Sequence, residues 1–335
     1  MAVPGRAGWD FRRGSREVRR RRFLQSLPAL SVPWLSACQL SEEPLRIGAN
    51  LWPGYSPLRL AEATGALPAD AGRVLDFPSS SAVLTAFRNG AIDAAALTLD
   101  EVILLAANQQ SPRIILVFDF SDGADVIIAR AGLNRIDELR GKRIGVETEA
   151  LGAYMVGRAL ARDGLALEEV EIVSLPMDRH EAAFVGGEVD ALVTFEPIRS
   201  SLLARGGRQL FSSADIPGEV VDVLVVRDEV LRRRHADLRA VVRAYFAGRT
   251  LAMAEPDEAV RRLGVRAGGG PESYRAAMSL MRLPDRQGNR ELLGVGPRSL
   301  HETLSRMAVT MTELKLIEGR VSLDGLLVSA LVEEV

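Results

Sequence analysis

From residue 45 onward, short apolar runs bounded by turn residues alternate with longer amphipathic segments. Runs of four to eight apolar residues are typical of buried strands, whereas apolar residues spaced three and four apart indicate helices. The pattern predicts strands at 45–50, 74–77, 92–98, 113–120, 126–129, 143–146, 170–175, 189–195 and 220–226. It predicts helices at 58–63, 81–87, 101–108, 150–162, 181–186, 238–255 and 299–316. Regular alternation of the two predicts an α/β fold.

One part of this pattern occurs twice. The stretch FRNGAIDAAALT at 87–98 returns as FVGGEVDALVT at 184–194, and Arg46, Ile47 and Gly48 return 97 residues later as Arg143, Ile144 and Gly145. A repeat near 97 residues has the size of a small domain rather than of a solenoid unit. The sequence therefore predicts two similar α/β lobes, with chance recurrence of short Ala- and Gly-rich motifs as the alternative.

The runs at 126–129 and 220–226 are interpreted as two crossings between these lobes. Residues 45–125 and 225–335 then form lobe 1, and residues 126–224 form lobe 2. Parallel α/β sheets bind ligands at the carboxyl ends of their strands, so two sheets that face each other across a hinge would enclose a solute. We expect the hinge near Asp125, Val126 and residues 221–223.

Composition and charge narrow the function. With 335 residues, 47% of them apolar, the chain can bury two cores. The first 37 residues hold eight Arg, and the remainder carries 34 basic and 42 acidic residues, which argues against nucleic acid as a partner. The single cysteine, Cys38, excludes a disulfide framework, and the three scattered histidines lack metal-ligand spacing. We therefore expect no metal and no cofactor.

The N-terminus resembles an export signal. Arg20, Arg21, Phe23 and Leu24 resemble a twin-arginine motif, an apolar segment follows at 27–34, and LSAC resembles a lipobox that ends at Cys38. Residues 1–37 are predicted to be removed and Cys38 to be lipidated, which gives a periplasmic, membrane-anchored lipoprotein. The alternative is a basic tail with an incidental cysteine. No later run reaches the roughly 18 to 20 apolar residues of a membrane helix.

Several stretches resemble one protein family. They are RIGANLWPGYSPLRLAEATGAL, FRNGAIDAAALT, FDFSDGADVIIA, LRGKRIGVETEALGAY and DALVTFEP, and they resemble the periplasmic solute-binding proteins of nitrate, sulfonate and taurine importers. That group includes pyrimidine-precursor binders related to thiamine-pyrimidine synthases, and the likeness spans residues 45–229. The resemblance implies a type II periplasmic binding fold, no catalysis, and delivery of a small solute to an ABC permease in the inner membrane.

Two other functions are compatible with parts of this sequence. A synthase-like enzyme would be expected to need a cluster of His and Cys for iron chemistry, and the only cysteine lies in the export segment. A periplasmic sensor that presents its solute to a membrane receptor would use the same cleft, so the sequence leaves that alternative open.

Candidate ligand-binding residues follow the predicted strands. Asn50, Trp52 and Tyr55 lie in the loop after the first strand, where aromatic faces could stack on a planar or cationic group. Ser80 lies in a serine run that precedes a helix, where free N–H groups would favour an anion, although helix capping explains the serines equally well. The remaining candidates are polar residues at or near strand ends, each with a helix cap or a solvated charge as its alternative: Thr98, Asp100, Asp119, Asp122, Glu147, Thr148, Glu196 and Asp222.

Carboxylates dominate these candidates, and no Lys or Arg stands beside them. Unit charges about 4 Å apart interact by roughly 4 kcal/mol at an effective dielectric of about 20, so this set would repel an anion and attract a cation. We therefore expect an amine-bearing, aminopyrimidine-like solute, with Glu147, Glu196 and Asp119 as its carboxylate partners. The alternative is a sulfonate or nitrate held by backbone donors at the helix starts near Ser80 and Thr148.

Overall fold

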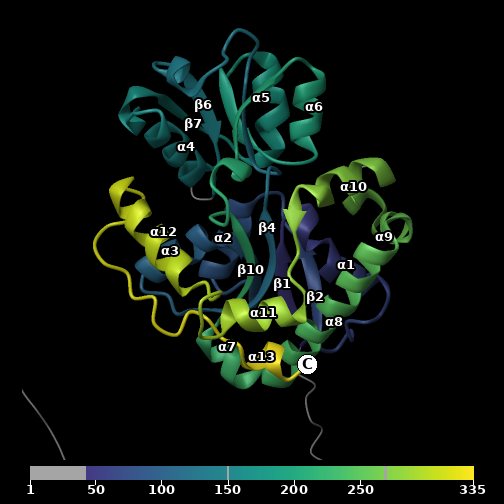
Figure 1. Ribbon diagram of the computed structural model, residues 1–335. Coiled ribbons are helices and arrows are strands. Elements are labelled where there is room, and N and C mark those ends of the chain that lie inside the picture. Colours follow the sequence, from purple (N-terminus) through teal and green to yellow (C-terminus); the bar gives the residue numbers. More distant parts are fainter. Residues whose placement is uncertain (1–42, 149–150, 268–269) are drawn as a thin grey trace, which may run out of the picture. The chain divides into compact units, whose positions relative to one another are not determined.

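The computed structural model describes residues 43–148, 151–267 and 270–335, and these form two β-sheets flanked by helices (Figure 1). The expected export signal at 1–37 and the lipidation site Cys38 lie outside the described residues. We call the part built on the six-stranded sheet lobe 1 and the part built on the five-stranded sheet lobe 2.

The sheet of lobe 1 has the order β11-β4-β10-β3-β1-β2. Its strands are β1 (Leu45–Ala49), β2 (Gly72–Asp76), β3 (Ala94–Thr98), β4 (Pro112–Ser121), β10 (Val221–Arg227) and β11 (Met281–Arg282). Strand β1 runs parallel to β2 and β3, whereas β10 lies antiparallel between β3 and β4. The N-terminal helices of this lobe are α1 (Ser56–Ala63), α2 (Ser80–Arg88) and α3 (Leu99–Ala107). The expected cap of α2 is present, since the hydroxyl of Ser79 accepts a hydrogen bond from the Ala82 N–H.

The sheet of lobe 2 has the order β7-β6-β8-β5-β9. Its strands are β5 (Val126–Ala129), β6 (Arg143–Val146), β7 (Glu171–Ser174), β8 (Ala191–Thr194) and β9 (Arg208–Ser212). Its helices are α4 (Leu151–Arg162), α5 (His180–Gly186) and α6 (Ile198–Ala204). Strand β6 is parallel to β7 and β8, and β5 is antiparallel to its neighbours β8 and β9. The parallel trio β2-β1-β3 of lobe 1 thus matches the parallel trio β7-β6-β8 of lobe 2, and in each lobe an antiparallel strand, β10 or β5, follows next in the sheet.

The repeated motifs occupy equivalent places in the two lobes. Ile47 is paired with Ala94 in lobe 1, and Ile144 is paired with Ala191 in lobe 2, each 97 residues further on. A forked ion pair follows the same offset: Nη2 of Arg46 lies 2.9 Å from Asp93 Oδ1, and Nη2 of Arg143 lies 2.9 Å from Asp190 Oδ1. Both arginines also donate to the carbonyl of the helix-ending glycine, Gly90 or Gly187. These shared contacts are more than two short motifs would share by chance.

The two runs interpreted as crossings lie inside the sheets, one as β5 and one as β10. The chain passes between lobes at 122–125 and 213–220 instead, and the boundary expected at 224 falls within β10 of lobe 1. The pattern also missed β9, because Arg208 and Gln209 at its start are exposed and interrupt the apolar run.

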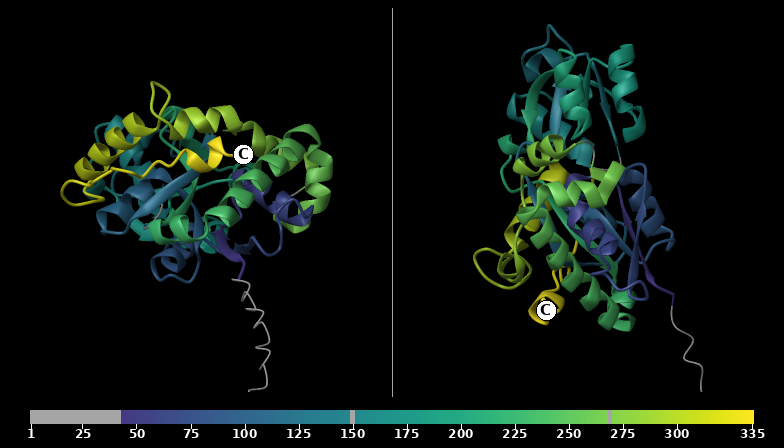
Figure 2. Two further views of the ribbon diagram at one scale, coloured as in Figure 1. Left: turned by 90° about the horizontal axis from the view of Figure 1, so that it is seen from below. Right: turned by 90° about the vertical axis from the view of Figure 1, so that its right-hand side faces the viewer.

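The C-terminal third packs mainly on lobe 1 as helices (Figures 1 and 2). They are α7 (Asp228–Arg233), α8 (His235–Ala254), α9 (Pro256–Leu263), α10 (Pro271–Ser279), α11 (Arg286–Leu293), α12 (His301–Glu313) and α13 (Ala330–Glu333). Helix α8 packs so closely against α1 that a Cβ atom at Gly248 would overlap the Pro57 carbonyl oxygen. No helix in the described part of the chain is long and apolar enough to cross a membrane.

Candidate functional site

A cavity lies at the carboxyl ends of the central strands and takes residues from both sheets. Its volume is ≈ 40 Å³, which is room for a few waters. Lobe 1 lines it with Asn50, Trp52, Tyr55, Ser80, Thr98 and Asp222. The first crossing and lobe 2 line it with Asp125, Glu147, Leu151, Gly152, His180, Val193, Thr194 and Phe195.

Strand register brings the acidic residues of lobe 1 together. Asp222 on β10 is paired with Thr98 on one side and with Asp119 on the other. Asp119 is fully buried and lies behind Trp52, whose indole Nε1 donates to Asp119 Oδ2 at 3.1 Å. Gly54 leaves the space that this carboxylate fills. Burial raises the pKa of Asp119 to about 8.

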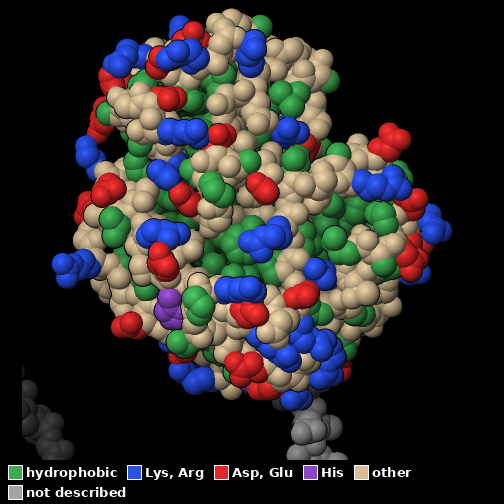
Figure 3. All heavy atoms as spheres, viewed as in Figure 1, with side chains coloured by type: hydrophobic (Ala, Val, Ile, Leu, Met, Phe, Trp, Pro, Cys, Tyr) green, Lys and Arg blue, Asp and Glu red, His purple; other side chains and the backbone are tan. Residues whose placement is uncertain are grey.

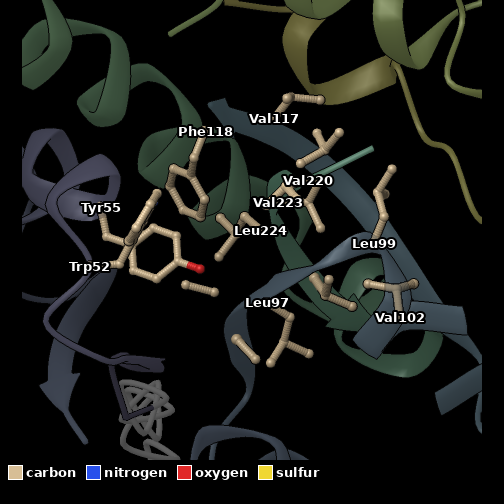
Figure 4. Packing of buried hydrophobic residues seen from close by; sticks show 14 of the residues in the cluster. Trp52, Tyr55, Leu97, Leu99, Val102, Val117, Phe118, Val220, Val223 and Leu224 are labelled. Carbon is tan, nitrogen blue, oxygen red and sulfur yellow. The ribbon is translucent and has the colours of Figure 1, made fainter. Parts of the chain in front are cut away.

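Tyr55 holds the carboxylate of Asp222 by a hydrogen bond. Its hydroxyl donates a short hydrogen bond to Asp222 Oδ1, and its ring packs 5.0 Å from the ring of Phe118 (Figure 4). Burial, with the neighbouring charge of Asp119 as a smaller cause, raises the pKa of Asp222 well above its ordinary value. Trp52 and Tyr55, which we call the aromatic wall, belong to the same hydrophobic core as Phe118, and Figure 4 shows all three side chains in this core.

Asn50 organises the loop after β1. Its Oδ1 accepts the Trp52 N–H at 3.0 Å, and its Nδ2 donates to the Ser80 hydroxyl at 2.7 Å. The guanidinium of Arg59 donates to the Asn50 carbonyl at 2.6 Å and to Asp76 at 3.0 Å. Arg59 is a buried cation that the sequence interpretation missed. Its charge is compensated by Asp76 and it does not line the cavity.

Glu147 follows β6 as Asn50 follows β1, and the two residues are 97 positions apart. The Glu147 side chain is buried and faces the N-terminus of α2 across the cavity. Burial raises the pKa of Glu147, while the Ser79 and Ser81 hydroxyls and the backbone N–H groups of Ser80 and Ser81 oppose that rise. Glu147 Oε1 itself has no hydrogen-bond partner.

Three buried oxygens that line the cavity lack a hydrogen-bond partner: Thr98 Oγ1, Asp125 Oδ2 and Glu147 Oε1. Burial raises the pKa of Asp125 to about 7. Among the described residues that line the cavity there is no Lys or Arg. The cavity is therefore rich in acceptors and lacks a cation of its own.

Lobe 2 contributes a neutral polar wall and an aromatic contact. Ring nitrogens of His180 lie 3.3 Å from Thr194 Oγ1 and 3.3 Å from the Leu175 carbonyl, and burial lowers the His180 pKa to about 4, so the ring is neutral at pH 7. The ring of Phe195 meets Trp52 of lobe 1 edge-on, with centroids 5.3 Å apart. The repeat could have located Thr194 and Phe195, which correspond to Leu97 and Thr98. The sequence placed Asp125 only near the hinge, and no sequence signal marked Asp125 or His180 as a residue of the cavity.

Seven of the twelve expected residues line the cavity, and five lie elsewhere. Asp119 is behind Trp52, and Asp122 is exposed in the first crossing. Asp100 and Thr148 line a separate hollow beside Tyr154. The carboxylate of Glu196 accepts hydrogen bonds from Arg199 and Ser200. Of the three carboxylates expected to contact the solute, only Glu147 lines the cavity, together with Asp125 and Asp222.

Known proteins resemble this chain in sequence and in fold. The taurine-binding periplasmic protein of Escherichia coli (strain K12) is 23% identical over 207 residues, which cover 60% of this chain and 64% of that relative, slightly less than two thirds of its length. The alkanesulfonate-binding protein SsuA from Xanthomonas axonopodis pv. citri, bound to MOPS, superposes with a TM-score of 0.71 at 19% identity and covers 86% of this chain and 98% of its own. The aliphatic sulphonate binding protein SsuA from Escherichia coli superposes with a TM-score of 0.68 at 17% identity and covers 87% and 99% of the two chains.

These structures confirm the expected fold class, the two-lobed α/β fold of periplasmic binding proteins. A model of the NMT1-like family matches residues 39–262, and this match includes the residues that line the cavity. Since it spans more than half of the sequence, the chain belongs to the NMT1-like family.

Proposed function

We propose that this protein is an extracytoplasmic solute-binding protein that captures a small amine-bearing solute, of aminopyrimidine-like chemistry, between its lobes and delivers it to an ABC permease in the inner membrane. The observation that carries the proposal is the cavity itself, with three unpartnered buried oxygens and no Lys or Arg among its described lining residues. Relatives and structural neighbours named for taurine and sulfonate binding support the solute-binding role.

The charge of the cavity favours a cation over an anion. Leaving a buried polar oxygen unpaired costs about 1–3 kcal/mol, and a protonated amine donates to several such oxygens at once. Asp125, Asp222 and Glu147 all have raised pKa values because they are buried, and a bound cation would favour their charged forms. Trp52 and Tyr55 add aromatic surface, with cation–π contacts of about 0.5–2 kcal/mol.

The alternative solute is a sulfonate or nitrate, as the names of the relatives suggest. Taurine carries an amine at one end and a sulfonate at the other, so a taurine-like solute would satisfy the carboxylates through its amine. An anion alone would rely on N–H groups at the start of α2, where Glu147 already lies.

The proposed location rests on the N-terminal sequence. Arg20, Arg21 and the LSAC ending at Cys38 support export and a lipid anchor. Replacement of Cys38 by Ser should move the protein from the membrane fraction to the soluble periplasmic fraction. An unchanged distribution would remove the lipid anchor from the proposal and leave the solute-binding role intact.

Isothermal titration calorimetry tests the solute class directly. Wild-type protein is titrated at pH 7.5 with an aminopyrimidine, ethylamine, a polyamine, taurine, ethanesulfonate and nitrate. We expect micromolar binding of at least one amine and no heat from ethanesulfonate or nitrate. Replacement of Asp222 by Asn should weaken the amine at least tenfold. Micromolar binding of ethanesulfonate or nitrate, with no heat from any amine, would refute the proposed solute.

A further inference from the structure

The start of helix α2 has the features of an anion-binding position. This helix has nine residues, and its first N–H groups have no partner within the helix. The Ser79 hydroxyl is occupied by the Ala82 N–H, and the Ser80 hydroxyl accepts from Asn50. The backbone N–H groups of Ser80 and Ser81 are therefore left to act on Glu147, and a helix N-terminus favours negative charge.

The side chain that faces these N–H groups comes from the other lobe. Glu147 exposes 7% of its surface, lines the cavity together with Ser80, and leaves Oε1 without a hydrogen-bond partner. The first turn of α4 packs closely against the backbone of Glu147. A Cβ atom at Gly152 would lie 3.0 Å from the Glu147 carbonyl oxygen and 3.1 Å from the Glu147 nitrogen. The backbone from which this carboxylate extends is thus closely packed.

We propose that Glu147 determines the specificity of the cavity by holding its own carboxylate at the N-terminus of α2 and so excluding sulfonates and other oxyanions. This inference rests on the proposed solute-binding function. The carboxylate of Glu147 occupies the position in which the anionic group of a sulfonate would otherwise bind, and it repels such a group. Like charges a few ångström apart in a buried site repel each other strongly enough to weaken micromolar binding at least tenfold.

The prediction is a gain of function. Replacement of Glu147 by Ala vacates the helix start, and replacement by Gln removes the charge while keeping most of the volume. The matched control is Asp125→Asn, which removes a buried carboxylate from the same cavity but leaves Glu147 in place. Each variant is titrated with ethanesulfonate at pH 7.5, after circular dichroism and thermal melting have shown that it is folded.

We expect wild-type protein to give no heat with ethanesulfonate, E147A to bind it with a micromolar Kd, E147Q to bind it more weakly than E147A, and D125N to bind it at least tenfold more weakly than E147Q. The proposal is overturned if E147A gains no affinity, or if D125N gains as much as E147A, since loss of charge alone would then explain the effect. Should E147A fail to fold, the comparison of E147Q with D125N decides in the same way. The amine titration of the wild type is a separate readout, so failure of the proposed function remains distinguishable from failure of this inference.

Discussion

At the scale of single residues, the site depends on carboxylates that are buried without a cation beside them. Asp125 is the clearest case, because its Oδ2 has no partner and burial raises its pKa to about 7. In such a site the charged form is favoured only when a ligand brings the opposite charge. The empty protein is thus expected to hold protons that it would release on binding a cation.

The raised pKa of Asp125 predicts a pH dependence of stability. Between about pH 4 and pH 7, the folded state keeps a proton on Asp125 that the unfolded state has released. The contribution of Asp125 to stability is therefore present at low pH and is lost as pH rises through 7. The slope is at most about 1.4 kcal/mol per pH unit. We expect urea unfolding from pH 5 to pH 8 to show a shallower decline in D125N than in wild type. The same substitution at exposed Asp122 is the control, and a D125N profile parallel to wild type would contradict the assignment.

Gly54 is predicted to position the aromatic wall. In Gly54→Ala the new Cβ atom would overlap Asp119 Oδ2 and would lie 2.5 Å from Trp52 Nε1, so one of the two must move. Overpacking of this kind costs about 1–3 kcal/mol. In a protein that lacks residues 1–37, Trp52 is the only tryptophan, so Gly54→Ala should also change the tryptophan fluorescence. Gly186→Ala, where a Cβ atom meets nothing within 4 Å, should leave both stability and fluorescence unchanged.

The sequence allowed part of this site to be predicted, for a physical reason. Asn50, Thr98 and Glu147 lie at the carboxyl ends of strands that the apolar pattern marks clearly, so their common location follows from the fold. Asp125 and His180 come from a crossing and from the start of a helix, and their positions depend on how the chain passes between the sheets. Glu196 follows β8, but its pairing with Arg199 one helical turn later keeps it out of the cavity.

At the scale of elements, the repeat is the main organising feature. Strands β1 and β3 of lobe 1 and strands β6 and β8 of lobe 2 are joined by the same arginine–aspartate fork and the same glycine. Because apolar runs and motif spacing are local properties, this part of the fold could be predicted. The antiparallel placement of β5 and β10 could not, since sheet order depends on contacts between distant segments.

The two forks should contribute similarly to stability. Each is a forked arginine–aspartate pair that is partly exposed, for which about 0.5–1 kcal/mol of coupling is expected. Double-mutant cycles on Arg46 with Asp93, and on Arg143 with Asp190, measured by urea unfolding, should give coupling energies of the same sign that agree within about 0.5 kcal/mol. Coupling in one lobe and none in the other would show that the forks are not equivalent. Arg135 and Asp137, an exposed local pair outside the repeat, provide the control.

At the scale of the whole folded unit, the two lobes meet around a cavity of ≈ 40 Å³. That space holds a few water molecules and is too small for an aminopyrimidine, so a solute enters through a more open arrangement. The crossings are tied together where the Ser213 hydroxyl lies 2.8 Å from the Ser121 hydroxyl and accepts the Gly123 N–H. Charged side chains of both signs occur over the face shown in Figure 3.

Lobe closure should be visible by small-angle scattering. Two lobes joined by two short crossings rotate as rigid bodies, with a few residues in 122–125 and 213–220 absorbing the change in backbone angles. We expect the radius of gyration to fall when the tightest amine of the panel saturates the protein. Superimposable curves with and without that amine would count against closure, and ethanesulfonate serves as the ligand that should cause no change.

The central claim is that the cavity selects a cation, and competitive retention tests it most directly. Wild-type protein is incubated with an equimolar mixture of the amines, ethanesulfonate and nitrate, separated from free solutes by gel filtration, and denatured, and the released solute is identified by mass spectrometry. The acceptor-rich cavity predicts that the retained solute carries a basic nitrogen. Retention of ethanesulfonate or nitrate, with no amine, would contradict the claim.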